Sequence, residues 1–322
     1  ARRGDASPSA GVGVTNVSPD AYTEGLNASI GTASAGFSAS GAIGNLAAGG
    51  SDAATLRVGL DTSTAGATSG SASVDFVSTG AGTTGAADLS VGSAIVGLVG
   101  RVYETAVASL TTSSVDFGIV HVGDVVTDRT VGVANAAPVA ALNDTLKASI
   151  ATGAAGFGAS GSVSGLAAGA NDTSSLLVAL DTTSAGFYSG SANVAFASSN
   201  PDMADLSLGS QSVALAAQVN NYADAALRQA GGFGVLSAVG DVYTLDFGTL
   251  VQGSAVRSAS LEVLNDVLGP SDLLDGQFGA TDTDDFAYLA SFFDLFTDLG
   301  AGQAQGGFGI SFDPITLGLV SD

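Results

Sequence analysis

The sequence predicts an all-β protein built from tandem antiparallel β-sandwiches. One observation is the alternation of apolar and small polar residues, as in residues 213–219, where every second position is apolar or alanine. A period of two is typical of a strand with one buried face. A second observation is that similar stretches recur after about 120 residues, which is too long for a solenoid and fits tandem domains. Short strands with turn signals between them, and without helical periods, favour sandwiches.

The one complete copy of the repeated unit occupies residues 110–222. It opens with Asp116-Phe117-Gly118 and closes on the alternating residues 213–219. Residues 1–109 repeat it without its first strand, and Leu46-Ala47-Ala48-Gly49 there matches Leu166-Ala167-Ala168-Gly169. A divergent third copy, residues 241–322, begins with Asp246-Phe247-Gly248 and lacks the last strands.

Residues 223–240 are expected to link the second and third copies. Residues 223–230 have the strongest helical character in the chain, and a Gly-Gly pair follows them. The incomplete outer copies leave two explanations open. Either the sequence is a window from a longer chain, or neighbouring subunits supply the missing strands head to tail and so build an open fibre.

Composition excludes several partners. The net charge is -22 and the pI is about 4.1, so nucleic acid and anionic lipid surfaces are repelled. No apolar run approaches the length of a membrane span. Hydrophobic residues make up 46% of the chain, which indicates a globular rather than a disordered protein. Cysteine is absent and lysine occurs once, and this acidic surface rich in small residues favours an extracellular or cell-surface location.

The motifs resemble a known family. Residues 116–135 and 246–265 share one pattern, which is Asp-Phe-Gly, a nearby glycine and then an alternating strand that ends in asparagine. This pattern is similar to that of the bacterial choice-of-anchor D repeats. These are immunoglobulin-like domains of the ASH (Hydin-like) superfamily. The Leu-Ala-Ala-Gly turn and Ala185-Gly186-Phe187-Tyr188-Ser189-Gly190 match the later half of the family pattern. The resemblance implies immunoglobulin-like sandwiches of seven to nine strands on secreted or surface-anchored bacterial proteins, and implies no activity.

The side chains that could carry chemistry are few. His121 is the only histidine, so one chain cannot assemble a Ser-His-Asp triad or a His-based zinc site. Arg3-Gly4-Asp5 matches the integrin-binding tripeptide, although three common residues often occur together by chance. Asp282, Asp284 and Asp285 are candidate calcium ligands, but their spacing fits no EF-hand, and a solvated acidic loop is the simpler interpretation. We expect no other cofactor.

Aromatic residues cluster where the third copy departs from the other two. They are Phe286, Tyr288, Phe292, Phe293 and Phe296. One interpretation is a local core, and the other is a contact patch for the next subunit, because aromatic residues are favoured at interface centres.

Together these features predict a non-enzymatic, secreted structural protein. Outward strand positions carry small residues that lose little rotamer entropy when another surface packs on them. Lysine, which hinders pairing at exposed strand edges, occurs only once, so the strand edges are poorly protected against pairing with another chain. We therefore expect a subunit of a surface filament that assembles with its own copies, head to tail. The alternatives are an adhesin stalk, a protein that binds extracellular polysaccharide, and an S-layer-type lattice protein.

Overall fold

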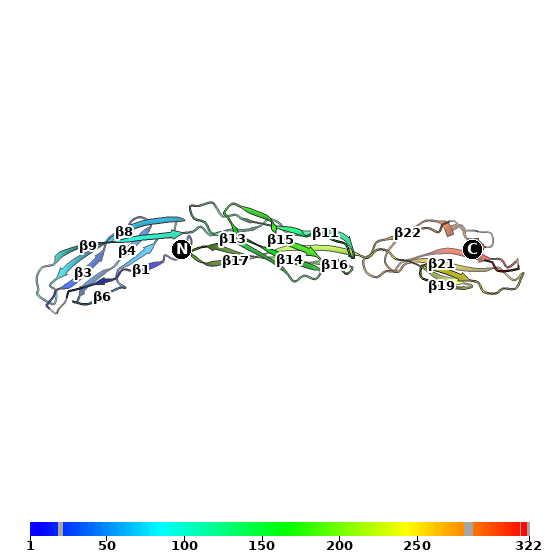
Figure 1. Ribbon diagram of the computed structural model, residues 1–322, viewed down its shortest axis with the longest axis horizontal. Coiled ribbons are helices and arrows are strands. Elements are labelled where there is room, and N and C mark those ends of the chain that lie inside the picture. Colours follow the sequence, from blue (N-terminus) through cyan, green and yellow to red (C-terminus); the bar gives the residue numbers. More distant parts are fainter. Residues whose placement is uncertain (19–21, 280–285, 316, 321–322) are drawn as a thin grey trace.

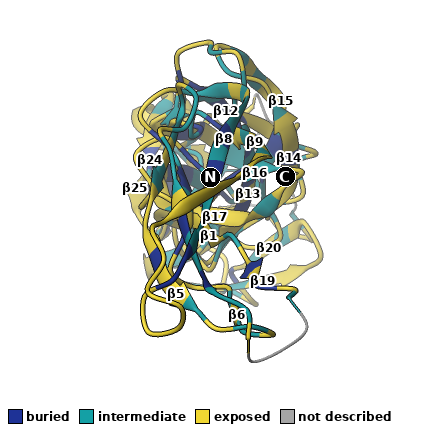
Figure 2. Cartoon of the chain, turned by 90° about the vertical axis from the view of Figure 1, so that its left-hand side faces the viewer, coloured by how far each residue is buried: buried dark blue, intermediate teal, exposed yellow. Residues whose placement is uncertain are grey.

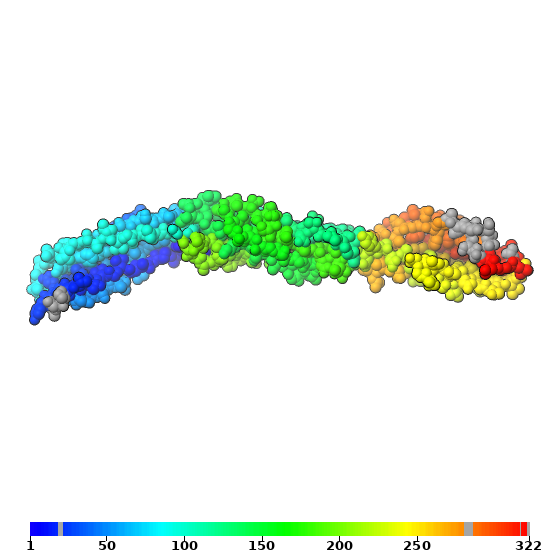
Figure 3. Space-filling view, viewed as in Figure 1, coloured from blue at the N-terminus to red at the C-terminus, as the bar shows by residue number. Residues whose placement is uncertain are grey.

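The computed structural model describes residues 1–18, 22–279, 286–315 and 317–320. The chain forms an elongated rod in which three β-rich units follow one another (Figures 1 and 3). We call residues 1–103 unit 1, residues 104–220 unit 2 and residues 221–322 unit 3. Each unit has its own hydrophobic cluster. The expected all-β fold class is confirmed, because strands and sheets make up the architecture.

Unit 2 is the most complete unit. Its eight strands are β10 (Ala108–Leu110), β11 (Ser114–His121), β12 (Arg129–Asn135), β13 (Thr145–Thr152), β14 (Phe157–Leu166), β15 (Asn171–Leu180), β16 (Gly186–Asn200) and β17 (Met203–Asn220). They follow the order β10-β12-β15-β14-β13-β16-β17-β11. Neighbours pair antiparallel, except that β11 runs parallel to β17 at the sheet edge.

Strand β14 connects the two layers of unit 2. Its first half pairs with β15 and its second half with β13, and the change occurs at Gly161. Gly161 has φ 106°, and a Cβ atom there would lie 2.0 Å from the Ser175 carbonyl oxygen. Only glycine therefore allows the strand to bend from one layer into the other.

Unit 1 repeats this layout with shorter strands. They are β1 (Ser9–Gly11), β2 (Val14–Thr15), β3 (Gly25–Ile30), β4 (Phe37–Ser40), β5 (Ala42–Leu46), β6 (Ser51–Asp52), β7 (Arg57–Leu60), β8 (Gly66–Thr79) and β9 (Leu89–Val102). One sheet has the order β1-β7-β4, another β5-β3-β8-β9, and β2 pairs with β6. Gly41, between β4 and β5, takes the place of Gly161, with φ 117°. Within the described residues, no strand of unit 1 takes the place of β11.

Unit 3 is the most divergent. Its elements are β18 (Ala225–Gly232), β19 (Val235–Val239), β20 (Val242–Asp246), β21 (Arg257–Asn265), β22 (Leu274–Gly276), β23 (Phe286–Tyr288), the 3-10 helix η1 (Ala290–Phe293), β24 (Phe296–Leu299) and β25 (Ala304–Phe312). The main sheet is β18-β21-β25-β23, with the pairs β19-β20 and β22-β24 beside it.

The helical turn expected at residues 223–230 is wrong. These residues enter β18, which pairs antiparallel with β21 from the Ala225–Asn265 pair to the Gly232–Ala259 pair. Residues 235–239 form β19, so most of the expected linker belongs to the sheets of unit 3. Pairing with β21 gives the segment partners for its backbone groups, and this outweighs its alanine-rich helix propensity.

The core follows the alternation that the sequence shows. Figure 2, which looks along the rod from the unit 1 end, shows exposed residues on the outer surfaces and buried residues between the layers. In β17, Val213, Leu215, Ala217 and Val219 are all buried, while Ala214 and Ala216 between them are exposed. Burial of such a stripe supplies the main driving force that holds each sandwich together.

Candidate functional sites at the junctions between units

The most elaborate polar structure in the described chain lies between units 1 and 2. Arg2 is mostly buried there, and its Nε donates to Asp144 Oδ2 at 2.6 Å. The Arg2 Nη2 also donates to the carbonyl oxygens of Ser198 and Ala204, at 3.2 and 3.1 Å. A guanidinium of the first unit is therefore held by a carboxylate and two carbonyls of the second.

Asp144 is fully buried, and two side chains of β16 satisfy its carboxylate together with Arg2. Ser198 Oγ donates to its Oδ2 at 2.7 Å, and Asn200 Nδ2 donates to its Oδ1 at 2.6 Å. Ser198 Oγ in turn accepts the Ala106 backbone N–H at 2.9 Å. A buried charge is tolerated when it is paired and hydrogen-bonded, and here both conditions are met across a unit boundary.

A second polar group, in which Tyr103 is buried and Arg101 is exposed, flanks this network. Tyr103 donates its hydroxyl proton to Asp202 at 2.7 Å, and Arg101 lies 3.3 Å from the same carboxylate. The hydrogen bond from Tyr103 lowers the pKa of Asp202, and the same bond raises the pKa of Tyr103. On the other side, Arg3 and Glu104 form an ion pair at 3.2 Å.

The junction between units 2 and 3 is built on His121. Its Nε2 lies 2.7 Å from Asp272 Oδ2, and its ring stacks on Tyr222 with centroids 4.3 Å apart. Asn220 Nδ2 also donates to Asp272, at 3.3 Å. The His121 and Asp272 side chains keep 30% and 38% of their surface exposed, so solvent screens this pair much more than it screens Arg2 and Asp144.

The two junctions are copies of one design. Arg2 forms a parallel bridge with Tyr103, and His121 pairs in parallel with Asn220. Just past each of these pairs, the Asp144 N–H donates to the Glu104 carbonyl at 2.8 Å, and the Asp272 N–H donates to the Asn221 carbonyl at 2.9 Å, so each aspartate is tied to the first residue of its own unit. In each case a basic side chain of one unit, Arg2 or His121, contacts an aspartate of the next unit, Asp144 or Asp272.

The turn that carries the basic residue is also repeated. In Arg2-Arg3-Gly4-Asp5 the Asp5 carboxylate accepts the Arg2 N–H at 2.7 Å, and in His121-Val122-Gly123-Asp124 the Asp124 carboxylate accepts the His121 N–H at 2.8 Å. Gly4 N–H donates to the Thr62 carbonyl and Gly123 N–H to the Thr182 carbonyl, both at 3.0 Å. The Arg-Gly-Asp tripeptide is thus part of a structural turn of this repeat.

Unit 3 has the same turn with different chemistry. In Val251-Gln252-Gly253-Ser254, the Gly253 N–H donates to the Pro314 carbonyl at 2.9 Å. Val251 stands where the other units carry Arg2 and His121, and it is 78% exposed. The far end of the rod therefore presents an apolar side chain at the position that is basic at both junctions.

His121 lies at the end of the edge strand β11 and at the junction between units 2 and 3. The sequence alone does not bring Arg2, Asp144 and Asp272 to notice, because their partners are far apart in the sequence. Alignment of Arg2-Arg3-Gly4-Asp5 with His121-Val122-Gly123-Asp124 is the signal that could have found them.

The candidate calcium ligands Asp282, Asp284 and Asp285 lie outside the described residues. Of the acidic residues near them in the sequence, Asp272 is used by the second junction, and Asp275 accepts the Asp298 N–H at 2.7 Å. In the part of the chain that the structure describes, no group of three or more His, Asp or Glu side chains is placed to hold a metal ion.

The five aromatic interface candidates surround the core of unit 3. Phe292 is buried and stacks on Phe278 at 4.5 Å, and Phe286 lies 5.8 Å from Phe247. Tyr288, 4.7 Å from Phe292, and Phe296 are partly buried. Phe293 is 37% exposed, so it is the member most available to another molecule. Their role as a contact patch stays a prediction.

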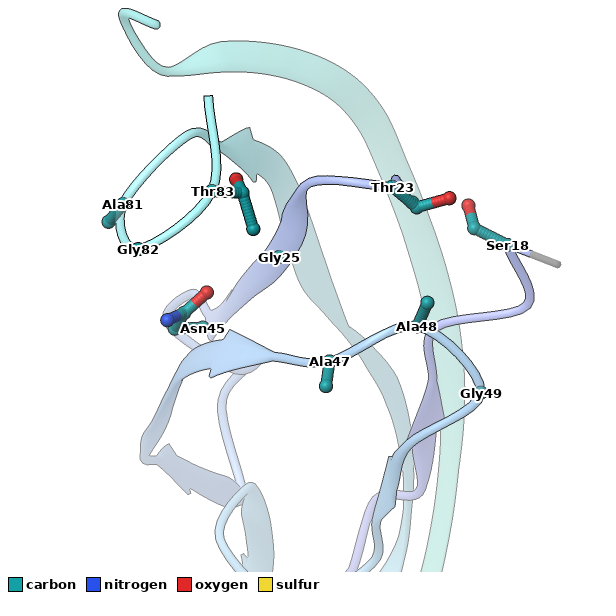
Figure 4. A pocket seen from close by; sticks show the side chains of 10 residues that line it. All are labelled: Ser18, Thr23, Gly25, Asn45, Ala47, Ala48, Gly49, Ala81, Gly82 and Thr83. Carbon is teal, nitrogen blue, oxygen red and sulfur yellow. The ribbon is translucent and has the colours of Figure 1, made fainter. Parts of the chain in front are cut away.

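Two hollows open at the free end of unit 1. The larger, about 530 Å³, lies between the loops near Asn45 and Thr83, and Figure 4 shows Ser18 and Thr23 at its other side. The smaller, about 340 Å³, is lined by Leu26, Phe76 and Val91 and also by Glu24.

Glu24 occupies the place in unit 1 that Asp144 occupies in unit 2. Its carboxylate accepts hydrogen bonds from Thr84 Oγ1 and Ser78 Oγ, as Asp144 accepts one from Ser198. The bonds from Thr84 and then Ser78 lower the pKa of Glu24, so this end of the rod carries a negative charge at neutral pH.

The arrangement at the junctions positions and holds units. The basic and acidic side chains there bind one another. Within those residues no helix is both long and apolar enough to cross a membrane.

The chain matches no protein-family model and no curated protein sequence. Among solved structures it is similar to a protein of unknown function from Porphyromonas gingivalis W83, with 12% identity over 66% of this chain and 91% of that chain, at a TM-score of 0.24. It is also similar to a marsupial T cell receptor, with 10% identity over 94% and 89% of the two chains and a TM-score of 0.29. A third match is the secreted serine protease VesC from Vibrio cholerae, with 10% identity over 91% and 70% and a TM-score of 0.19.

Proposed function

We propose that this protein is a non-enzymatic structural subunit of an extracellular or cell-surface filament, built from tandem immunoglobulin-like sandwiches. The observation that carries the proposal is the repeated junction, in which a basic side chain of one unit binds an aspartate of the next. An enzyme or a ligand carrier needs a reactive or enclosing site. A filament needs units that are held in a fixed relation along one axis.

The buried Arg2–Asp144 network supports a defined joint between units 1 and 2. Paired buried charges demand particular geometry, because a shifted unit leaves a charge without its partner. The units are also joined without a flexible spacer, since β9 ends at Val102 and Glu104 already bonds to the Leu142 carbonyl of unit 2.

The outer surface supports association between rods. Outward positions of β16 and β17 carry small side chains such as Ser191, Ala195 and Ser210. Small side chains allow close approach and lose little entropy on burial. We propose self-association, head to tail, as the route by which the rods become a longer assembly.

Negative-stain electron microscopy of purified protein, with sedimentation velocity over a 100-fold range of concentration, tests this function. We expect rods about as long as three units, which join into filaments as concentration rises. A monomer at every concentration, with and without calcium, would contradict the filament role.

A second candidate is an adhesin stalk whose tip binds extracellular polysaccharide. The hollow of about 530 Å³ at the free end of unit 1, which Ser18, Thr23, Asn45 and Thr83 help to line, favours it. Glycan-array binding by the wild-type chain, lost in an Asn45→Ala variant and retained in a variant at the opposite end such as Val251→Ala, would select this function over the filament.

A further inference from the structure

The His121 ring at the second junction lies between carboxylates of two units. Its Nε2 is 2.7 Å from Asp272 Oδ2 of unit 3, and its Nδ1 is 3.6 Å from Asp124 Oδ2 in its own turn. Its third titratable neighbour is Tyr222 of unit 3, whose ring stacks on it at an interplanar angle of 8°. Both nitrogens and one face of the imidazole are therefore turned to groups that favour a cation.

The proton on this ring decides how many of these contacts are attractive. A protonated imidazole donates from both nitrogens, whereas a neutral one donates from a single nitrogen and presents a lone pair at the other. In the neutral ring, one nitrogen that faces a carboxylate therefore carries no proton. The carboxylates of Asp124 in unit 2 and Asp272 in unit 3 then repel each other without a cation between them.

The first junction has the same layout around a permanent cation. Arg2 binds Asp144 of the next unit through its side chain and Asp5 of its own turn through its backbone N–H. A guanidinium stays charged at every pH that a folded protein meets, whereas the charge of a histidine ordinarily changes between pH 5 and pH 8. The chain thus carries one joint with a fixed charge and one whose charge depends on a proton.

Solvent reaches the second joint much more than the first. The side chains of His121 and Asp272 are 30% and 38% exposed, against 10% and 0% for Arg2 and Asp144. A proton can therefore enter and leave the imidazole while every unit stays folded. The same exposure limits the size of the effect, because an exposed ion pair shifts an equilibrium by less than about sixfold.

The backbone passes from unit 2 to unit 3 at the point where the ring acts. β17 ends at Asn220, and Asn221 already bridges Ser271 of unit 3. Beside the ring, Asn220 Nδ2 donates to Asp272 at 3.3 Å, which is long for a hydrogen bond. Unit 3 can therefore pivot about this point when the ring releases Asp272.

We propose that the second junction is a pH-dependent joint. With His121 protonated, the ring holds Asp272 and keeps unit 3 in line with unit 2. As pH rises from 5 to 8, the ring loses its proton, the contact weakens and unit 3 pivots more often, while the first junction stays fixed. The joint belongs to a single chain, so this inference goes beyond the proposed function and does not depend on it.

Single-molecule fluorescence energy transfer on the full chain tests this joint. The chain has no cysteine, so pairs of labels can be attached to cysteines that replace exposed serines. Ser191→Cys with Ser237→Cys spans the second junction, and Ser40→Cys with Ser191→Cys spans the first. From pH 5.5 to pH 8 the ratio of pivoted to aligned molecules should rise about twofold to fivefold across the second junction. It should stay constant across the first.

Two substitutions of His121 separate its charge from its other contacts. His121→Arg copies the chemistry of the first junction and should keep the joint aligned at pH 8. His121→Gln keeps a hydrogen-bond donor without a charge, so it should be as open at pH 5.5 as the wild type is at pH 8. Neither variant should respond to pH. Circular dichroism verifies that both fold, and either one together with the first-junction labels decides the outcome.

A pH response that survives in His121→Gln would overturn the proposal, because another group would then carry it. An unchanged ratio in the wild type between pH 5.5 and pH 8 would overturn it as well. So would an equal response across the first junction, since this would show a general effect of charge on the rod. A pH-independent second joint in a protein that forms filaments would leave the proposed function standing.

Discussion

Replacement of Asp144 by alanine is expected to open the first junction while the equivalent change at the second junction has little effect. Asp144→Ala leaves the Arg2 guanidinium buried with only two carbonyl partners. Breaking one side of a buried ion pair costs about 3–5 kcal/mol. Asp272→Ala removes the partner of a histidine that is 30% exposed, where a pair is worth about 0.2–1 kcal/mol.

Hydrogen exchange of single amides measures this difference, because a chain with three separate cores has no single free energy of unfolding. The reporters at the first junction are the N–H groups of Ala106 and Glu104. At tenfold for each 1.4 kcal/mol, their exchange should accelerate by about 10²-fold to 10³-fold or more in Asp144→Ala. The Asn221 N–H, which donates to Pro270, should accelerate by less than about tenfold in Asp272→Ala.

The double variant Arg2→Met with Asp144→Leu is the control. It removes both charges at once and replaces them with apolar groups, which is often close to neutral. Exchange should therefore return most of the way to the wild-type rate. Equal acceleration at the two junctions, or a double variant as open as Asp144→Ala, would refute the argument that burial sets the strength of these joints.

Three further outcomes are expected. Gly161→Ala should unfold unit 2, since its Cβ would overlap the Ser175 carbonyl. In the control Gly158→Ala the nearest contact of the new Cβ is at 3.7 Å, so the melting temperature of unit 2 should stay within a few degrees of wild type. Equal melting temperatures for the two variants would contradict this. Phe117→Ala should cost unit 2 about 3–5 kcal/mol, because Phe117 is buried in the core cluster of that unit. Hydrogen exchange of the unit 2 amides measures this cost, and a value below about 1 kcal/mol would show that β11 is dispensable. Asp172 has a pKa below its ordinary value, chiefly because Ser175 N–H donates to its carboxylate, so its stabilising effect is complete above the ordinary pKa and is lost as pH falls through the lowered one. Between pH 5 and pH 2 the melting temperature should thus fall less for Asp172→Asn than for wild type. Parallel curves of melting temperature against pH would contradict a stabilising role of the Asp172 carboxylate.

Alternation and repetition predicted the sandwich architecture well, because burial of one strand face is a local property of the sequence. The period-two pattern of residues 213–219 is the pattern of buried and exposed residues in β17. The helical expectation for residues 223–230 failed for a tertiary reason. The free edge of β21 offers that segment a full set of backbone partners, and no local pattern shows this.

The junctions were harder to predict because they depend on groups that meet only after folding. Arg2, Asp144 and Ser198 are separated by more than 50 residues, and each is ordinary in its own sequence context. The sequence suggests calcium ligands at Asp282, Asp284 and Asp285. The nearby Asp272 instead contacts His121 at the second junction, which the sequence does not show. The similarity of residues 2–5 to residues 121–124 is the signal in the sequence that points to both junctions.

The long strands β16 and β17 lie along the rod, and β17 leads directly into the second junction (Figure 1). A pull on the two ends of the rod therefore loads their many cross-strand hydrogen bonds at the same time, in shear. Strands that crossed the axis would instead release their bonds one after another. The partly exposed His121 joint is the weaker of the two joints, so under tension a whole unit can tilt there before any sandwich unfolds.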